Sequence, residues 1–266
     1  QLARPEGRAQ PGLSIMARIL LLVHRLPYPP NKGDKVRSYH LLRHLARRHE
    51  VHLGTFVDDP EDEPHVATVR GWCASVHAAR LNPLRARAAS LAGLWRGEAL
   101  TLSYYRDAGL AAWVRALREQ RAVDAVIVFS SSMAPYADGF DVPVLVDFVD
   151  VDSAKWTDYA GGHRWPMSWL YRREGRQLLA YERAVAARAQ RAYFVTERET
   201  ALFLERAPEC AARVRALGNG VDAGFFAPDA DRASPFDDGE QPLVFTGAMD
   251  YWPNVDEDQQ IGRAHV

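Results

Sequence analysis

The sequence predicts an α/β fold, a Rossmann-like, doubly wound and mostly parallel sheet, followed by only the start of a second domain. Three observations predict it. Short apolar runs alternate along the chain with longer segments whose apolar residues recur at helical spacing. The first run, residues 17–23, is continuously apolar, as in strands buried on both faces. The composition, with 47% hydrophobic and 25% charged residues, is that of a globular protein.

Four strands and four helices are predicted up to residue 129. The strands cover residues 17–23, 50–57, 75–81 and 124–129. The helices cover residues 35–49, 64–72, 84–95 and 104–120. Val36, Tyr39 and Leu42 follow one another at helical spacing in the first helix. Asn82 and Pro83 break the chain before the third helix, and Ser103 is placed to cap the fourth.

The second half continues the alternation. Strands are predicted at 143–148, 193–195 and 214–217, and helices at 163–191 and 196–206. Pro143 suits the first residue of a strand. Thr196 and Glu199 have the spacing of a capping box. The long helix has two candidate interruptions, Pro166 and Gly175, and the sequence does not choose between them.

Composition excludes several classes of protein. With 33 basic and 34 acidic residues the net charge is −1, so a strongly basic nucleic-acid binder is excluded and no nucleic-acid partner is expected. Cys73 and Cys210 lack the spacing of a disulfide scaffold or a zinc site. The longest aliphatic run, residues 19–23, is far shorter than the roughly 20 residues of a membrane span. Residues 1–15 lack a signal peptide's apolar stretch, which predicts a cytoplasmic location.

In doubly wound sheets ligands bind beyond the carboxyl ends of the strands, so the loops after residues 23, 129, 148 and 217 are candidates. The first loop, residues 24–35, contains three prolines, and Gly33 lets a ligand approach the backbone just before a helix N-terminus. One glycine makes no phosphate-binding loop. On composition alone an ordinary turn with Asp34 as N-cap is favoured.

An acidic cluster follows the strand at 143–148. Asp147, Asp150 and Asp152 stand so close in sequence that they must be solvated, protonated or matched by a ligand. Asp150 and Asp152 form a D-x-D pair that could hold a divalent metal and a diphosphate. The alternative is a strand end at which Asp152 or Ser153 caps the next helix. Lys155 is placed to neutralise the pair.

Aromatic and basic residues alternate in residues 163–176. In a helix, Trp165, Trp169, Arg172 and Arg176 would line one face, which suits a membrane surface or a lipid-linked anionic substrate. Packing of the tryptophans into the core, with solvated arginines, is the favoured interpretation.

Taken together, several stretches resemble the N-terminal half of a retaining glycosyltransferase of the GT-B fold, in family 4. The nearest likeness is to sugar transferases associated with exosortase/PEP-CTERM exopolysaccharide systems. The stretches are residues 26–37 with the helix continuing to 51, 147–156, 182–192, 194–203, 218–222 with Phe226, and 244–256.

The resemblance implies two Rossmann-like domains, the first binding a glycan or lipid-linked acceptor and the second a nucleotide-sugar donor, with no metal cofactor. It implies a substrate-binding role for Gly33, and Asp150 is the catalytic candidate. Further substrate-binding candidates are Asp34, Lys35, Asp152, Lys155, Asn219 and Gly220. Many members place a histidine after the fourth main strand, where this chain has Ser130, Ser131 and Ser132. That contact would pass to Asp150 or a serine.

Three alternatives remain open. The first is a metal-dependent transferase of the GT-A type that uses Asp150 and Asp152. The second is a non-enzymatic module that binds a sugar or nucleotide. The third is an assembly protein of a polysaccharide locus that uses the face from Trp165 to Arg176.

The expected organisation is an upstream extension without regular structure (1–15), the acceptor-side domain (16–228), a linker (229–241) and the start of a donor-binding domain (242–260), including a strand at 243–246. Residues 261–266 are the translation of the nucleotide sequence ATC GGA AGA GCA CAC GTC, which matches a common sequencing adapter. We therefore expect a truncated product that lacks its donor site and transfers no sugar. A peripheral position at the inner membrane is left open.

Overall fold

The computed structural model describes residues 16–224, 226–227, 233, 236, 239 and 242. The chain divides after Asn219 into two compact units. In the second unit residues 223–224 lie in a turn, where the Gly224 N–H donates to Asp222 Oδ1 (3.1 Å). The expected extension (1–15), the expected strand at 243–246 and the expected adapter-derived tail (261–266) lie outside the described residues.

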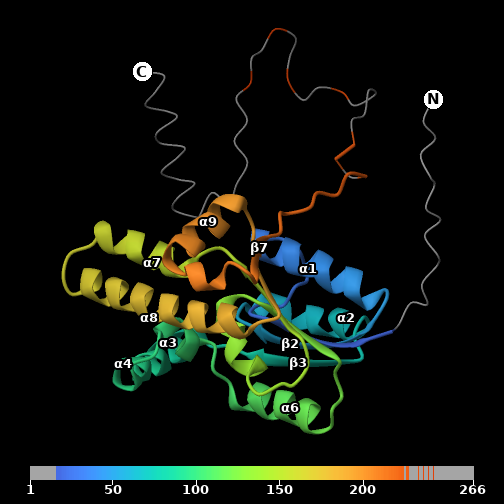
Figure 1. Cartoon of the computed structure of the whole chain (residues 1–266). Coiled ribbons are helices and arrows are strands. Elements are labelled where there is room, and N and C mark those ends of the chain that lie inside the picture. Colours follow the sequence, from blue (N-terminus) through green and yellow to red (C-terminus); the bar gives the residue numbers. More distant parts are fainter. Residues whose placement is uncertain are drawn as a thin grey trace, which may run out of the picture. The chain divides into compact units, whose positions relative to one another are not determined.

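Seven parallel strands form one sheet in the order β3-β2-β1-β4-β5-β6-β7 (Figure 1). The strands are β1 (Arg18–Val23), β2 (Glu50–Val57), β3 (Ser75–Arg80), β4 (Ala125–Phe129), β5 (Val144–Val149), β6 (Arg191–Phe194) and β7 (Val214–Ala216). The chain runs outward from β1 to β3, returns to β4 beside β1, and runs outward again. The predicted doubly wound α/β fold is confirmed, with its switch point between β1 and β4.

Helices cover both faces of the sheet. They are α1 (Gly33–Ala46), α2 (Val66–Arg70), α3 (Pro83–Ser90), α4 (Ala92–Arg96), α5 (Leu100–Tyr104), α6 (Ala108–Glu119), α7 (Asp152–Gly161), α8 (Met167–Arg188) and α9 (Glu197–Arg206), with 3-10 turns η1 (Pro60–His65), η2 (Ser131–Ala137) and η3 (Pro208–Cys210). Leu21 of β1 packs with α1 and α2, whereas Leu20 packs with α6 and α8. Because alternate residues of β1 enter separate cores, the strand is apolar throughout. None of the described helices is long and apolar enough to cross a membrane.

The first helix differs from its prediction at both ends. It begins at Gly33 and ends at Ala46, whereas residues 35–49 were predicted. The prediction that Asp34 is the N-cap is wrong. Lys32 occupies the cap position, without a side-chain hydrogen bond, and Asp34 lies in the first turn. The carboxylate of Asp34 is therefore available for contacts across the sheet edge.

The cap predicted at Ser103 is also wrong. Ser103 lies within α5, a helix that was not predicted, and α6 begins after Asp107, whose carboxylate accepts from the Leu110 N–H (2.7 Å). The N-terminus of α5 is held by Glu174 of α8, which accepts from the backbone N–H groups of Leu100 and Thr101. A cap supplied from so far along the chain leaves no local sequence signal.

The second half contains one helix more than predicted. Helix α7 was not predicted as a separate element, and α8 begins after Pro166 and runs unbroken through Gly175. At Gly175 a Cβ would lie 2.6 Å from Thr157 Oγ1 and 2.9 Å from the Ser153 carbonyl oxygen. The glycine therefore permits close packing of α7 on α8 and does not break the helix.

The predicted capping box at α9 is half formed. Thr196 Oγ1 accepts from the Glu199 N–H (3.0 Å), as expected. The Glu199 carboxylate accepts instead from the backbone N–H of Val151 (2.7 Å). This contact ties α9 to the loop after β5, where the acidic cluster lies.

Candidate functional site

The ends of β4 and β5 meet at the carboxyl edge of the sheet, and two residues there, one just after β4 and the other the last of β5, have an unfavourable backbone conformation. Ser130 has φ 77° and Val149 has φ 69°. The Ser130 N–H donates to the Asp147 carbonyl oxygen (2.8 Å), and the register of β5 shifts between Asp147 and Val149. Positive φ is rare for a β-branched residue and costs on the order of 1–3 kcal/mol. Such strain is typical of ligand-binding edges.

Arg37 joins three segments that are far apart in sequence. From α1 its Nε donates to Asp147 Oδ2 at the end of β5 (2.8 Å). Its other nitrogens donate to Asn219 Oδ1 (2.9 Å) and to the carbonyl oxygen of Leu217 (2.8 Å), beyond β7. Burial raises the pKa of Asp147, although the Arg37 guanidinium opposes the rise. Sequence reasoning assigned Arg37 no role, because its partners lie more than a hundred residues away.

Lys155 matches the other two carboxylates of the acidic cluster. Its ammonium lies 2.7 Å from Asp150 Oδ2 and 3.2 Å from Asp152 Oδ1, the neutralising contact that was predicted. Burial and the neighbouring Asp150 raise the pKa of Asp152 despite Lys155, and the two carboxylates raise the pKa of Lys155 against the effect of burial. All three side chains remain partly exposed, so the cluster stays open to a ligand.

Glu182 of α8 lies directly beneath this cluster. It is fully buried, and Ser153 Oγ donates to its Oε2 (2.6 Å). Burial raises the pKa of Glu182 to about 8, and the charge of Asp152 adds to the rise. A pKa in this range favours the protonated form of Glu182 at neutral pH, which nothing in the sequence predicted.

Asp34 faces the end of β1 and takes part in a second charged group. Its Oδ2 lies 3.3 Å from His24 Nε2 and 3.3 Å from an Arg25 nitrogen, and Arg25 also binds Asp58 (2.9 Å). Burial would raise the pKa of Asp34, but the hydrogen bond from His24 and the nearby positive charges outweigh it and lower the pKa well below its usual range. Asp34 therefore stays ionised and orients His24.

His24 is a candidate that the sequence analysis passed over. Its ring stacks on Phe129 at the end of β4 (centroids 6.0 Å apart) and meets Tyr105 edge-on (5.9 Å). Its Nδ1 is buried and has no hydrogen-bond partner within the described part of the chain. A histidine from the loop after β1 thus lies beside the end of β4.

The other predicted residues of this edge differ in accessibility. Lys35 is buried and its ammonium binds Asp62 (2.5 Å), so the side chain is engaged inside the protein and not directed at a ligand. Gly33 is open: a Cβ there would meet nothing within 4 Å. Asn219 is held by Arg37, and Gly220 begins the second unit.

The tryptophans of residues 163–176 are not core residues, so the favoured interpretation was wrong. Trp165 is 81% exposed and Trp169 is 51% exposed. Trp165 also precedes α8 and therefore does not share a helix face with Trp169, Arg172 and Arg176, which are exposed along α8 itself.

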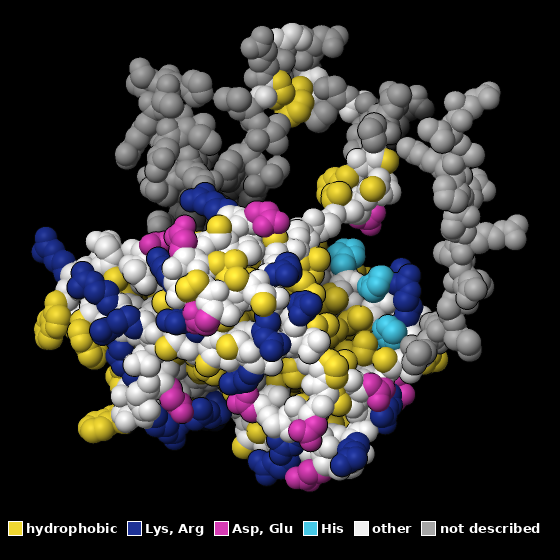
Figure 2. Space-filling view, viewed as in Figure 1, with side chains coloured by type: hydrophobic (Ala, Val, Ile, Leu, Met, Phe, Trp, Pro, Cys, Tyr) yellow, Lys and Arg dark blue, Asp and Glu magenta, His cyan; other side chains and the backbone are white. Residues whose placement is uncertain are grey.

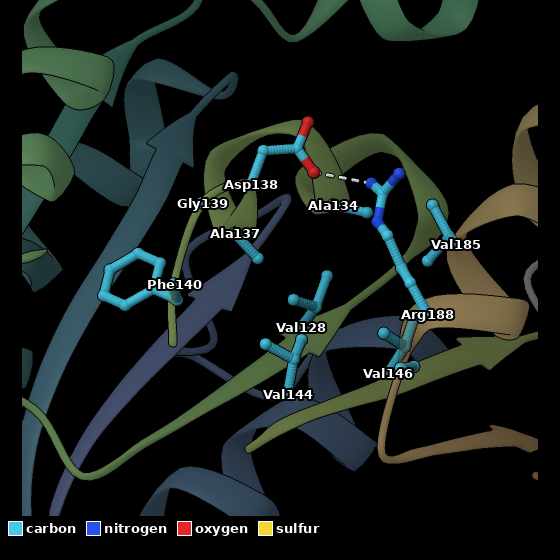
Figure 3. Close-up of a pocket in the computed structure, with 11 residues that line it drawn as sticks. Val128, Ala134, Ala137, Asp138, Gly139, Phe140, Val144, Val146, Val185 and Arg188 are labelled. Carbon is cyan, nitrogen blue, oxygen red and sulfur yellow. Dashed lines mark hydrogen bonds and ion pairs between the residues drawn. The ribbon is translucent and has the colours of Figure 1, made fainter. Parts of the chain in front are cut away.

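Two pockets border these elements. One, of about 420 Å³, lies between α3, α5, α7 and α8, and we call it the aromatic pocket because four of its ten lining residues, Tyr104, Tyr105, Trp156 and Tyr171, are aromatic. Tyr105, which touches His24, and Trp156, which follows Lys155, both line it, so the pocket adjoins the carboxyl edge. The other, of about 210 Å³, has a floor of Val128, Val144 and Val146 and lies under the Asp138–Arg188 ion pair (Figure 3). It contains none of the predicted site residues.

Within the described residues no group of three or more His, Cys, Asp or Glu side chains is arranged to hold a metal ion. At the D-x-D pair the ammonium of Lys155 lies where a cation would bind. Asp150, Asp152 and Lys155 therefore form an ion-paired cluster.

No protein-family model and no curated protein matches the chain. Among solved structures it is similar to the Candida albicans trehalose-6-phosphate phosphatase N-terminal domain (15% identity, TM-score 0.42, covering 83% of this chain and 52% of that one). It is also similar to Medicago truncatula UGT71G1 complexed with UDP-glucose (9% identity, TM-score 0.42, covering 77% of this chain and 52% of that one). A further similar structure is Arabidopsis thaliana UGT89C1 complexed with UDP (11% identity, TM-score 0.41, covering 82% of this chain and 51% of that one). The chain spans about half the length of these structures. Its fold class rests on its own seven-stranded sheet.

Proposed function

We propose that this chain is the acceptor-side domain of a GT-B glycosyltransferase, of the family 4 type used in bacterial exopolysaccharide synthesis. The complete enzyme would transfer a sugar from a nucleotide-sugar to a glycan or lipid-linked acceptor, with retention of configuration and without a metal cofactor. The observation that carries the proposal is the set of contacts made by Arg37. It joins three of the stretches on which the resemblance rests: residues 26–37, 147–156 and 218–222.

The chemistry would be shared among groups at the carboxyl edge. The N-terminus of α1, with the open Gly33, offers backbone N–H groups to a leaving diphosphate. His24, held by Asp34 and packed against Phe129 and Tyr105, would shape this edge of the site without contacting the donor through its buried Nδ1. Asp150, beside Lys155, would accept a hydrogen bond from the attacking hydroxyl of the acceptor. The aromatic pocket next to these groups would hold the acceptor.

The test is sugar transfer by the complete product of the gene, followed as nucleoside diphosphate release with a panel of nucleotide-sugars and lipid-linked acceptors. Transfer should persist in EDTA. Loss of activity in EDTA with rescue by manganese would support the GT-A alternative and count against ours. Absence of diphosphate release from every pair would leave the non-enzymatic alternatives.

A substitution at Gly33 tests the site directly. Gly33→Leu should lower transfer at least about tenfold while the melting temperature changes little, because a Cβ at this position meets no protein atom within 4 Å but a side chain there blocks the approach of a ligand. Ala112→Leu, at an exposed position of α6, is the control and should keep its activity. Equal losses of stability and activity at Gly33 would support the plain-turn interpretation.

A further inference from the structure

The segment formed by α3 and α4 turns its large apolar residues outward. Leu84, Leu91 and Trp95 are exposed, Trp95 by 95%, whereas the small residues Ala86 and Ser90 are buried. Leu91 keeps helical backbone angles between the two helices (φ −59°, ψ −24°), so the outward residues recur on one face at helical spacing. A helix of a globular protein normally buries its larger apolar residues.

This orientation is fixed by contacts on the inner side. At Gly93 a Cβ would lie 3.0 Å from Ser103 Oγ, so the glycine allows α4 to pack tightly against α5. The buried guanidinium of Arg173 donates to the carbonyl oxygens of Gly93 (3.1 Å) and Glu98 (3.0 Å). The segment therefore cannot rotate to bury its apolar stripe without breaking these contacts.

A second apolar cluster borders the aromatic pocket as well. Trp165, just before α8, and Met167 and Trp169, at its start, are exposed. Arg87 of α3 and Leu170 of α8 line the same pocket, so both segments border it. In Figure 2 hydrophobic side chains protrude both over the α7–α8 turn and over the end of α4.

Both segments are purely cationic, although the whole chain has a net charge of −1. Residues 83–97 contain Arg85, Arg87 and Arg96 and no acidic residue, and all three arginines are exposed. Residues 161–172 contain exposed Arg164 and Arg172, again without an acidic residue. Two copies of such a surface would repel each other, which disfavours a second copy of this chain as its partner.

We propose that these two segments, residues 83–97 and 161–172, form a docking surface for a membrane that contains anionic phospholipid. Indole rings and leucines suit the boundary between headgroups and acyl chains, and arginines beside them attract anionic headgroups. The combination binds peripherally and needs no membrane-spanning helix.

Docking would place the aromatic pocket next to the bilayer. If the proposed function holds, the pocket takes the apolar part of a lipid-linked acceptor while the sugar end reaches Asp150 and Lys155. This step alone rests on the proposed function. The membrane docking itself requires no transferase activity.

The experiment is co-sedimentation of the chain with vesicles of phosphatidylglycerol and phosphatidylcholine, compared with vesicles of phosphatidylcholine alone. The wild type should bind the anionic vesicles at least about tenfold more tightly. Trp95→Ala combined with Trp165→Ala, and separately Arg85→Glu combined with Arg172→Glu, should each lower that binding about tenfold or more. All four positions are exposed, so thermal melts should match that of the wild type.

Arg115→Glu combined with Arg198→Glu, at exposed arginines of α6 and α9, is the matched control and should bind as the wild type does. Equal binding to both kinds of vesicle, or equal loss in the control, would overturn the proposal. So would a dimer in solution that Trp95→Ala dissociates, together with no vesicle binding. Sugar transfer plays no part in the readout, so failure here leaves the proposed function standing.

Discussion

Two lysines pair with carboxylates near the carboxyl edge, and their surroundings differ. Lys35 and Asp62 have side chains exposed by only 2% and 4%, and their charges meet inside the protein. Lys155 lies between Asp150 and Asp152 with 43% of its side chain exposed. The sequence suggested a ligand-binding role for both lysines. Only the second one reaches the surface.

The difference shows which charges can take part in binding. A buried pair has lost its hydration, and each charge is compensated only by the other. Moving either charge to a ligand would therefore leave its partner buried and uncompensated, at a large cost in free energy. An open group of two carboxylates and one ammonium retains contact with water, and a ligand can exchange with one member. We therefore regard Lys35–Asp62 as part of the scaffold that holds α1 against η1, and Lys155 as part of the site.

The largest expected effect is at the buried pair. Lys35→Met should lower the free energy of unfolding by about 3–5 kcal/mol, because it leaves the carboxylate of Asp62 buried and uncompensated. Denaturant titration followed by circular dichroism measures this effect. Lys35→Met combined with Asp62→Leu removes both charges and should recover most of the loss. If Lys35→Met alone were as stable as the wild type, the pair would not be shielded from water.

Sequence predicted the strands well and the partners of side chains poorly. Strands such as β1 were predictable because burial on both faces leaves a continuous apolar run. The neutralising role of Lys155 was predictable because Asp150 and Asp152 are its neighbours in sequence. The partner of Lys35 is 27 residues away, and only the packing of η1 on β2 brings it close. Helix α5 was missed for the same reason, because a distant residue of α8 caps it.

Glu182 offers an intermediate test, because it is as buried as Asp62 but, within the described residues, forms no salt bridge with a lysine. Burial raises its pKa from the ordinary value of 4.5 to about 8. Between these values the folded protein holds a proton that the unfolded chain has released. Stability should therefore be greatest below about pH 4.5 as far as this group is concerned, and should fall as pH rises through 8, by roughly 5 kcal/mol.

Glu182→Gln, which resembles the protonated acid, should remove this fall. Wild type and variant should have similar unfolding free energies near pH 5, and the variant should be the more stable near pH 8. Ser153→Ala removes a hydrogen bond that lowers the pKa of Glu182, so the fall should continue to higher pH. A constant difference between wild type and Glu182→Gln across this range would contradict the buried proton.

The smallest effect on stability is expected at the open cluster. Lys155→Met should change the free energy of unfolding by no more than about 1 kcal/mol, because all three charges are partly solvated and water screens their attraction. Its effect should appear in protonation instead. Lys155 lowers the pKa of Asp152 whereas Asp150 raises it, so without the lysine the pKa of Asp152 should rise further, as a carboxyl carbon NMR titration would show. Lys155→Arg, which keeps the charge, should restore much of the original titration. A stability loss as large as that of Lys35→Met, with no change at Asp152, would mean that the two lysines do the same structural work and that the cluster is not an open site.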